Sequence, residues 1–442
     1  MPVSAARSAA FDILLAVEKK NAYASELLHS QSCANLSPVD HRLTTEIVMG
    51  VLRWRSVLDS EVAAHSSHIL AKLDAEVLTA LRMGIYQMRF LERVPARAAV
   101  HESVELIKRA RKRSAVPFAN AILRKIQKAP RVEAEVSVSK IATELATASA
   151  HPAWLVERWV KRFEFDAARA ICQHNQQVPA TAIHATDEGS VKELLTEGIE
   201  LAPGRLLASA RTVNSGDITK TRAFLAGRVA IQDEASQLVA LLVGKGTQIL
   251  DCCAAPGGKT RVLAERNPQA KILALELHPH RARLLRKMVP HKNVEVVTAD
   301  AGHFSSNWRF DRILVDAPCS GTGTLARNPE IKWRLNAVDL QDLQSRQLAI
   351  LRAAMKQLAP GGKLIYATCS LEDEENSAVV EAALSEQPEL RLIECKKELE
   401  RLKNDGELAW PEVASLLHGP YLRTIPGIHP CDGFFAAALT RN

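Results

Sequence analysis

The sequence of 442 residues lacks the patterns of membrane, secreted and metal-binding proteins. No apolar run reaches the roughly 20 residues that a membrane-spanning helix needs. The stretch from Met1 to Arg7 lacks the charged-then-apolar order of a signal peptide. The eight cysteines are scattered without a C-x-x-C pair, so we expect free thiols and no bound metal. These absences predict a cytoplasmic protein with no membrane partner.

At about 150 residues per domain, the length indicates two or three domains. The patterns divide the chain into three predicted domains: an all-α helical bundle over 1–130, a small α+β module over 150–225, and an α/β domain over 226–442. The formal net charge is +7. If this excess is clustered, it favours a polyanionic partner.

Helical patterns run through the whole of 1–130. Ser37 can cap a helix, Pro38 suits its first position, and Asp40 completes a capping box. Apolar residues then recur at helical spacing: Ile47, Val48, Val51 and Leu52, and further on Val77, Leu78, Leu81, Ile85 and Met88. The connections are short, so we expect a compact bundle.

The last helices of this region carry many basic residues. They are Lys108, Arg109, Arg111, Lys112, Arg113, Arg124, Lys125 and Lys128. Most charge runs are solvated helix faces, and that reading stays open. The density of one sign over about twenty residues makes contacts with nucleic-acid phosphates an alternative of at least equal weight.

The region after the bundle is less regular. Residues 130–150 are typical of a linker or a loose helix, and 150–225 of an α+β module with short strands. His151 and His184 are isolated, and ordinary packing or a surface position is the favoured reading for both. The segment 395–425 shows no pattern that assigns it.

From 226 onward, strand and helix patterns alternate, which predicts a parallel sheet with crossover helices. The expected strands are 248–252, 271–276, 294–298, 311–315 and 362–367. The apolar run 433–439 is expected to be a further strand, at the edge of the sheet. Ligands bind at the carboxyl ends of the strands in open α/β sheets, so the residues that follow each strand matter most.

The first of these strands breaks into small residues and a glycine pair, Gly257 and Gly258, before a helix begins. Such a turn lets the backbone approach a ligand. A dinucleotide site needs G-x-G-x-x-G, which this turn lacks. A phosphate-binding P-loop needs a glycine where Cys253 stands. The third reading is a pocket for S-adenosylmethionine, in which no phosphate has to be held.

Two acids at the ends of the next strands support the third reading. Glu276 lies about twenty residues beyond the glycine turn, where a carboxylate can accept hydrogen bonds from both ribose hydroxyls. Asp300 follows the third strand, where an acid suits the exocyclic amine of adenine. Each acid alone could cap a helix. Together, beside a glycine turn, they describe an adenosine site without phosphate clamps.

Asp316 and Cys319 follow the fourth strand, and Cys369 follows the fifth. Two thiols and a carboxylate should therefore converge beside the cofactor. A thiolate that adds to carbon-6 of a pyrimidine activates carbon-5 for methylation, and covalent catalysis of this kind divides one hard step into easier ones. Asp316 is the candidate acid for N3, and donation requires a raised pKa, which a dry pocket could supply. The residues alone leave open which cysteine attacks.

The motifs 251–259, 316–321 and 368–370 resemble those of the RNA cytosine-C5 methyltransferases of the Sun type, over about 230–442. The resemblance implies a Rossmann-like domain that uses S-adenosylmethionine, with Cys369 as the nucleophile and Cys319 promoting product release. Lys259 is assigned to the active site as well, with a surface lysine at a helix start as its alternative. The implied cofactor contacts are Cys253, Ala254, Ala255, Pro256, Gly257, Gly258, Lys259, Glu276, Asp300 and Asp316.

The segments 98–106 and 118–124 resemble the end of the NusB-type RNA-binding helical domain. This resemblance covers the N-terminal third and implies 16S ribosomal RNA of the small subunit as the partner, bound by a monomer. Transfer RNA is the alternative substrate. A loop or bulge is the expected target, because the base must leave its stack to enter a pocket.

A different class of function is a non-catalytic RNA-binding factor on a methyltransferase scaffold. Such a scaffold would not need Asp316, Cys319 and Cys369 together. A nicotinamide oxidoreductase would require the missing glycine fingerprint. The segment 327–334 places basic residues around Trp333, which suits an RNA strand, although a core tryptophan flanked by surface charges is an equal alternative.

Overall fold

The computed structural model describes residues 3–130 and 141–442, without the side chains of Gln31 and Ser32. The chain divides into two compact units: residues 1–178 with 325–334, and residues 179–324 with 335–442. Most of the predicted linker, 131–140, lies outside the described residues. No helix of the described part is long and apolar enough to cross a lipid bilayer.

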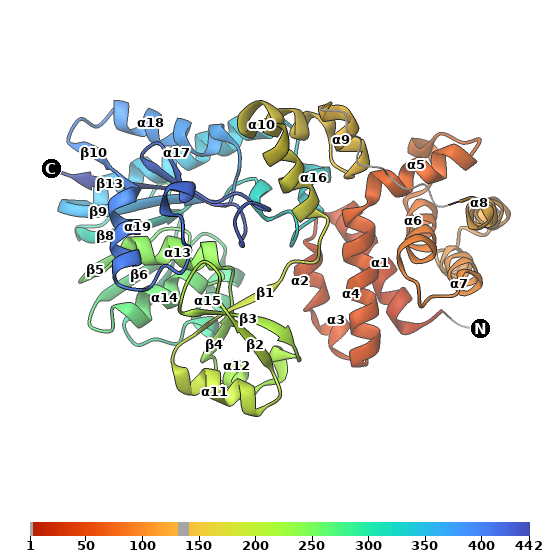
Figure 1. The fold of residues 1–442 in the computed structure, drawn as a ribbon, viewed down its shortest axis with the longest axis horizontal. Helices are drawn as coiled ribbons and strands as arrows, with labels where there is room; N and C mark the ends of the chain where they lie inside the picture. Colours follow the sequence, from red (N-terminus) through yellow and green to blue (C-terminus); the bar gives the residue numbers. More distant parts are fainter. Residues whose placement is uncertain (1–2, 131–140) are drawn as a thin grey trace. The chain divides into compact units, whose positions relative to one another are not determined.

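The first unit is helical, as predicted (Figure 1). Its main helices are α1 (Ala5–Lys20), α2 (Ala24–Leu28), α3 (Gln31–Ala34), α4 (Pro38–Arg53), α5 (Arg55–His65), α6 (Ala75–Phe90), α7 (Ala96–Arg109), α8 (Val116–Lys128), α9 (Ala142–Ala148) and α10 (Ala153–Asn175). The predicted cap at the start of α4 is present, because the Ser37 hydroxyl accepts the N–H of Asp40 at 3.1 Å. Ile47, Leu81 and Ile85 are fully buried in one core cluster.

The segment 325–334 leaves the second unit and packs within the first, where it forms α16 (Ile331–Arg334). The Nζ atom of Lys332 donates to the carbonyl of Arg53 at 3.0 Å, and the indole N–H of Trp333 donates to the carbonyl of Leu52 at 2.6 Å. Lys332 is 1 % exposed. Its contacts agree with the packing alternative for this segment rather than with an RNA-binding strand.

A small antiparallel sheet opens the second unit, with strand order β2-β3-β1-β4. Its strands are β1 (Thr181–Ala185), β2 (Glu200–Pro203), β3 (Ala210–Ser215) and β4 (Val229–Ile231), with helices α11 (Glu188–Thr196) and α12 (Arg222–Leu225). A small α+β module of the expected kind is therefore present, with its sheet over 181–231. The helix α10, which lies within the predicted bounds 150–225, belongs to the first unit. His184 packs against the next domain, with Nε2 2.6 Å from Oε2 of Glu265.

The large sheet has the order β11-β12-β13-β9-β8-β5-β6-β7, and β10 pairs with β13. The strands are β5 (Gln248–Asp251), β6 (Lys271–Glu276), β7 (Val294–Thr298), β8 (Phe310–Asp316), β9 (Leu358–Thr368), β10 (Leu390–Ile393), β11 (Leu417–His418), β12 (Tyr421–Arg423) and β13 (Phe435–Arg441). The five predicted strands all form and pair in parallel.

The expectation that the last strand lies at the sheet edge is wrong. β13 runs antiparallel between β9 and β12, and Phe435, Ala437 and Leu439 are buried. An apolar run of this kind suits an interior strand that is covered on both faces. The unassigned segment 395–425 supplies part of the new edge, because it contains α19 (Cys395–Asn404), β11 and β12.

Helices cover both faces of this sheet. They are α13 (Glu234–Val243), α14 (Gly258–Arg266), α15 (Pro279–Met288), α17 (Asp339–Gln357) and α18 (Ser377–Ser385). Ile249 lies in one core cluster and its neighbour Leu250 in the other, as the alternation of side chains along a strand requires. Because β5 has β6 on one side and β8 on the other, the strand order reverses at β5. In α/β sheets such a switch point is where ligands bind.

Candidate active site at the carboxyl ends of the parallel strands

The glycine turn joins β5 to α14 at the switch point. Gly257 has φ +117°, and a Cβ atom there would lie 2.6 Å from Cγ2 of Val289 and 2.8 Å from Cδ1 of Leu285. For a Cβ atom at Gly258, the three nearest atoms would all belong to the side chain of Gln232, the closest at 3.2 Å. Gly257 is therefore required by its own backbone conformation and by close packing of the turn against α15. These are reasons internal to the protein, in addition to any ligand contact.

Asp251, the last residue of β5, is 1 % exposed. Its Oδ2 accepts the hydroxyl of Thr260 at 2.7 Å, while Oδ1 has no hydrogen-bond partner among the described residues. Burial raises the pKa of this carboxyl to about 7. A carboxyl with a raised pKa therefore lies at the end of β5.

Asp316 lies at the end of β8 and pairs with Lys259, with 2.7 Å between Oδ2 and Nζ. Lys259 is in the first turn of α14 and its side chain is 12 % exposed. Burial opposes its charge, but the carboxylate of Asp316 outweighs that effect and the pKa of Lys259 is raised. The thiol of Cys369 acts in the same direction. Lys259 is thus mostly buried and paired at the carboxyl ends of the strands, which does not agree with a surface lysine.

The Sγ atoms of Cys319 and Cys369 lie 3.3 Å apart. Backbone hydrogen bonds hold their two turns together: Ala317 N donates to Ala367 O, and Gly323 N donates to Cys369 O, both at 2.9 Å. The hydrogen bond to Cys369, together with burial, raises the pKa of Cys319 well above that of an ordinary thiol. The geometry therefore favours a protonated Cys319 next to the sulfur of Cys369.

Sequence reasoning missed Glu375. This acid of the run 372–375 is fully buried and accepts hydrogen bonds from Ser320, Ser370 and Gln347. The available signal was the repeated Cys-Ser pair, because serine hydroxyls that are buried beside the two thiols need hydrogen-bond partners.

The other cofactor candidates lie at neighbouring strand ends. Glu276 ends β6, is 4 % exposed, and accepts the N–H of His278 at 2.9 Å. Asp300 follows β7 and is exposed; hydrogen bonds from His303 and from the N–H of Gly302 lower its pKa. Burial raises the pKa of Cys253 far above its usual range, so this thiol can line a pocket but is a poor nucleophile.

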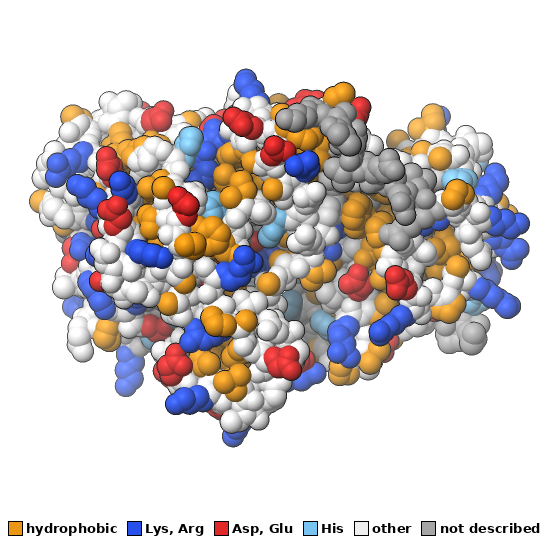
Figure 2. All heavy atoms as spheres, viewed as in Figure 1, with side chains coloured by type: hydrophobic (Ala, Val, Ile, Leu, Met, Phe, Trp, Pro, Cys, Tyr) orange, Lys and Arg blue, Asp and Glu red, His pale blue; other side chains and the backbone are white. Residues whose placement is uncertain are grey.

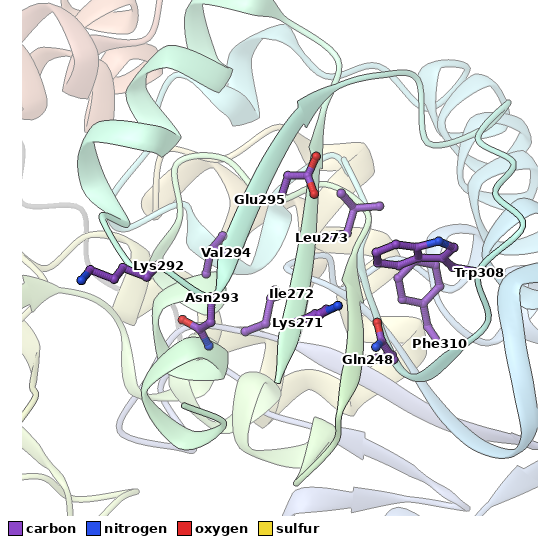
Figure 3. Close-up of a pocket in the computed structure, with 10 residues that line it drawn as sticks. All are labelled: Gln248, Lys271, Ile272, Leu273, Lys292, Asn293, Val294, Glu295, Trp308 and Phe310. Carbon is purple, nitrogen blue, oxygen red and sulfur yellow. The ribbon is translucent and has the colours of Figure 1, made fainter. Parts of the chain in front are cut away.

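A cavity of about 170 Å³ lies elsewhere on the same sheet (Figure 3). Gln248, Lys271 and Val294, which begin β5, β6 and β7, line it together with Trp308. These are the amino ends of the strands. The cavity is therefore separate from the site formed by the carboxyl ends, and none of the candidate catalytic residues lines it.

The reversed strand order, the glycine turn and the acids at successive strand ends define a Rossmann-like methyltransferase that uses S-adenosylmethionine. A family model described as 16S rRNA methyltransferase RsmB/F matches residues 238–440, and one described as NusB family matches residues 4–128. The chain belongs to the RsmB/F family.

Curated relatives resemble the chain over most of its length. The probable ribosomal RNA small subunit methyltransferase B of Bacillus subtilis is 32 % identical and covers 100 % of both chains. The ribosomal RNA small subunit methyltransferase B of Vibrio cholerae is 31 % identical and covers 92 % of this chain and 91 % of its own. The solved structure of PH0851 has a TM-score of 0.82 at 24 % identity, covering 100 % of this chain and 99 % of that one. This last likeness shows the shared fold.

Proposed function

We propose that the protein transfers a methyl group to carbon-5 of a cytosine in 16S ribosomal RNA through a covalent bond between Cys369 and carbon-6. The observation that carries this proposal is the contact of 3.3 Å between the thiols of Cys319 and Cys369. The ion pair of Lys259 and Asp316, at the same carboxyl ends, supports it. A scaffold without catalysis would need neither feature.

The chain's own residues can carry the proton and sulfur steps. Lys259 favours the thiolate of Cys369 by its charge, and that thiolate adds to carbon-6 of the base. Asp316 faces N3 of the base. As the thiolate adds to carbon-6 and the ring electrons move toward N3, this nitrogen receives the proton that Asp316 shares with Lys259. Bound S-adenosylmethionine supplies the methyl group as an electrophile to carbon-5.

Product release then requires transfer of the proton on carbon-5 to water and cleavage of the bond between carbon-6 and Cys369, which leaves as the thiolate. The proton on N3 returns to the pair of Asp316 and Lys259. Cys319 suits the second event, because its thiol can donate a hydrogen bond to the departing sulfur at the observed contact. The raised pKa of Cys319 keeps that proton on the thiol.

The residues fit the cofactor in chemistry. Glu276 and Asp300 offer carboxylates for the ribose and the adenine amine, and the buried Oδ1 of Asp251 still lacks a donor among the described residues. We therefore assign cofactor contacts to the turn 253–259 and to Glu276, Asp300 and Asp316. No phosphate-binding turn accompanies them.

We also assign roles to the three predicted domains. Residues 1–130 bind RNA, 150–225 contain three of the four strands of the small module, and 226–442 carry catalysis, in a protein that acts as a monomer in the cytoplasm. The relatives named as small-subunit rRNA methyltransferases favour 16S rRNA over transfer RNA. Equal methylation of both RNAs would contradict that preference, and equal methylation of a fully paired duplex would contradict a flipped target base.

The decisive experiment compares two single substitutions with labelled 16S rRNA and labelled cofactor. Cys369→Ala should abolish methyl transfer and any covalent protein–RNA adduct. Cys319→Ala should abolish turnover and accumulate the adduct. The matched control is Cys395→Ala, which replaces a buried cysteine on α19. This variant should show unchanged methyl transfer and an unchanged amount of adduct.

The reverse pattern would exchange the roles of the two cysteines. Methylation without any trapped adduct in either variant would remove the covalent mechanism.

A further inference from the structure

We propose that Glu375 is a positioning residue that holds the thiols of Cys319 and Cys369 in contact. The proposal rests on the proposed two-cysteine mechanism. Glu375 lies just before α18, and among the described residues its carboxylate forms no hydrogen bond with the thiol of Cys319 or of Cys369. It acts through the serine that follows each cysteine.

Both oxygens of this carboxylate are engaged. Oε2 accepts the hydroxyl of Ser370 at 2.5 Å and also the hydroxyl of Ser320. Oε1 accepts the backbone N–H of Ser320 at 2.7 Å and the side-chain amide of Gln347 at 2.9 Å. One carboxylate therefore joins the turn that carries Cys319 to the turn that carries Cys369.

The donor pattern fits an ionised carboxylate, which accepts hydrogen bonds and donates none. Glu375 is fully buried, and no ion pair to it is found among the described residues. Its charge is compensated by hydrogen bonds alone, which are stronger when the acceptor is charged. A buried charge held in this way is costly to disturb, because a lost donor leaves an unpaired group in the interior.

A role limited to capping α18 does not account for these contacts. The carboxylate accepts the N–H of Ser320, which lies 55 residues earlier in the chain. Among the described residues, the carboxylate accepts no hydrogen bond from a backbone N–H of α18. Gln347 extends the same link, because its Nε2 also donates to the carbonyl of Pro318 at 2.9 Å. Three connections thus converge on the residues that flank Cys319.

The functional consequence follows from the short distance between the sulfurs. A thiol hydrogen bond weakens steeply as its geometry is lost, so a small shift of one turn would separate the donor Cys319 from the leaving Cys369. We expect formation of the adduct to continue and its release to slow.

The test compares Glu375→Gln with Glu386→Gln, a matched change of an exposed acid at the end of α18 that pairs with Arg352. Glutamine keeps the size of the side chain but presents an NH₂ group to two existing donors. We expect kcat to fall by about tenfold or more, since small displacements of reacting groups have effects of this order. KM for RNA and for the cofactor should change little, and the protein–RNA adduct should accumulate.

A second measurement on the same variants needs neither RNA nor cofactor. Diamide oxidises two neighbouring thiols to a disulfide: they lose two protons and two electrons, and diamide is reduced to the hydrazine. The rate of this bond between Cys319 and Cys369, followed by peptide mapping of the full-length protein, should fall about tenfold in Glu375→Gln, by the same argument from displaced groups. It should be unchanged in Glu386→Gln.

An unchanged rate of disulfide formation in folded Glu375→Gln would overturn the proposal. A rise in KM without a fall in kcat would overturn it as well. If this variant fails to fold, Ser370→Ala, which breaks one link and keeps the carboxylate, must slow the disulfide or the proposal fails. The disulfide reading also separates the two proposals: a Glu375-dependent rate in a protein that methylates no cytosine would refute the function and leave the positioning intact.

Discussion

The Nζ atom of Lys259 lies 2.7 Å from Oδ2 of Asp316, with the two side chains 12 % and 27 % exposed. The raised pKa of Lys259 keeps the ammonium charged through neutral and mildly alkaline pH. The pair therefore holds one transferable proton between its two side chains. In the mechanism proposed above, this is the proton that reaches N3 of the base.

Replacement of that ammonium should slow the chemical step. We expect Lys259→Met to lower the single-turnover rate by about 10²-fold or more, a typical contribution of one positioned acid or base. Lys259→Arg should restore little, because the guanidinium differs in shape and does not give up its proton. The control is Lys396→Met, an exposed lysine on α19. A rate within a factor of about two of wild type would remove Lys259 from the proton pathway.

The buried carboxyl of Asp251 should make stability depend on pH. Its pKa is raised from 3.8 to about 7, so the folded state resists ionisation while the unfolded chain ionises above pH 3.8. The wild-type protein therefore loses stability from about pH 4 to pH 7, and the loss is constant above that. At about 1.4 kcal/mol per pH unit, the loss is at most about 4 kcal/mol.

Asp251→Asn removes this loss and keeps an acceptor for Thr260. We expect the free energy of unfolding of the variant to exceed that of wild type increasingly between pH 4 and pH 7. Urea denaturation at several pH values measures the difference. Parallel curves for the two proteins across this range would show that the carboxyl ionises without cost.

Lys332, in the first unit, should change stability with pH in the direction opposite to that of Asp251. Burial lowers its pKa well below 10.5, and its Nζ atom donates to the carbonyl of Arg53. For a lysine with a lowered folded-state pKa, stability is lost as pH falls from about 10.5 towards that lowered value. Lys332→Met, which keeps the length of the side chain, should therefore gain stability relative to wild type as pH is lowered from 10.5 to 7.

Thermal or urea unfolding at pH 7, 9 and 10.5 checks this expectation. The matched control is Lys19→Met, an exposed lysine of the same unit that pairs with Glu76. If Lys332→Met is equally destabilised at every pH, the lysine contributes by packing and by its hydrogen bond, and its charge carries no cost.

Much of the large sheet could be predicted because its strands are short apolar runs with clear breaks. The meeting of Cys319 and Cys369 followed from one rule, that parallel strands bring their carboxyl ends to one edge. β13 was misplaced, because an apolar run alone does not tell an edge strand from an interior one. Its neighbour β12 comes from the segment 395–425, which carried no pattern.

The remaining differences depend on contacts that no local pattern encodes. In the sequence, Glu375 resembles an ordinary acid in the first turn of a helix. Only its hydrogen bond with Ser320, far away in the sequence, distinguishes it. Trp333 was ambiguous for the same reason, because its partner is the carbonyl of Leu52 in α4, far away in the sequence. The raised pKa at Asp251 required knowledge of burial, which the sequence suggests for the strand and not for each side chain.

The basic surface of α7 and α8, visible as blue side chains over these helices in Figure 2, divides into two groups. In the first, each cation pairs with an acid: Lys108 with Glu105, Arg109 with Asp12 and Lys112 with Asp74. In the second, the exposed residues have no ion pair with any described residue: Arg111, Arg113, Arg124, Lys125 and Lys128. Cations of the second group are more available to RNA phosphates, because no acid of residues 3–130 or 141–442 has to be displaced.

The double variant Arg124→Gln/Lys125→Gln should therefore weaken binding of 16S rRNA more than Lys108→Gln/Arg109→Gln, although each removes two positive charges. Each lost phosphate contact should also reduce the slope of log K against log salt by about 0.7 for single-stranded RNA. Filter binding from 50 to 200 mM salt measures both quantities. Equal losses in the two variants would mean that RNA responds to total charge on these helices, and no loss in either would leave the basic residues as a solvated surface.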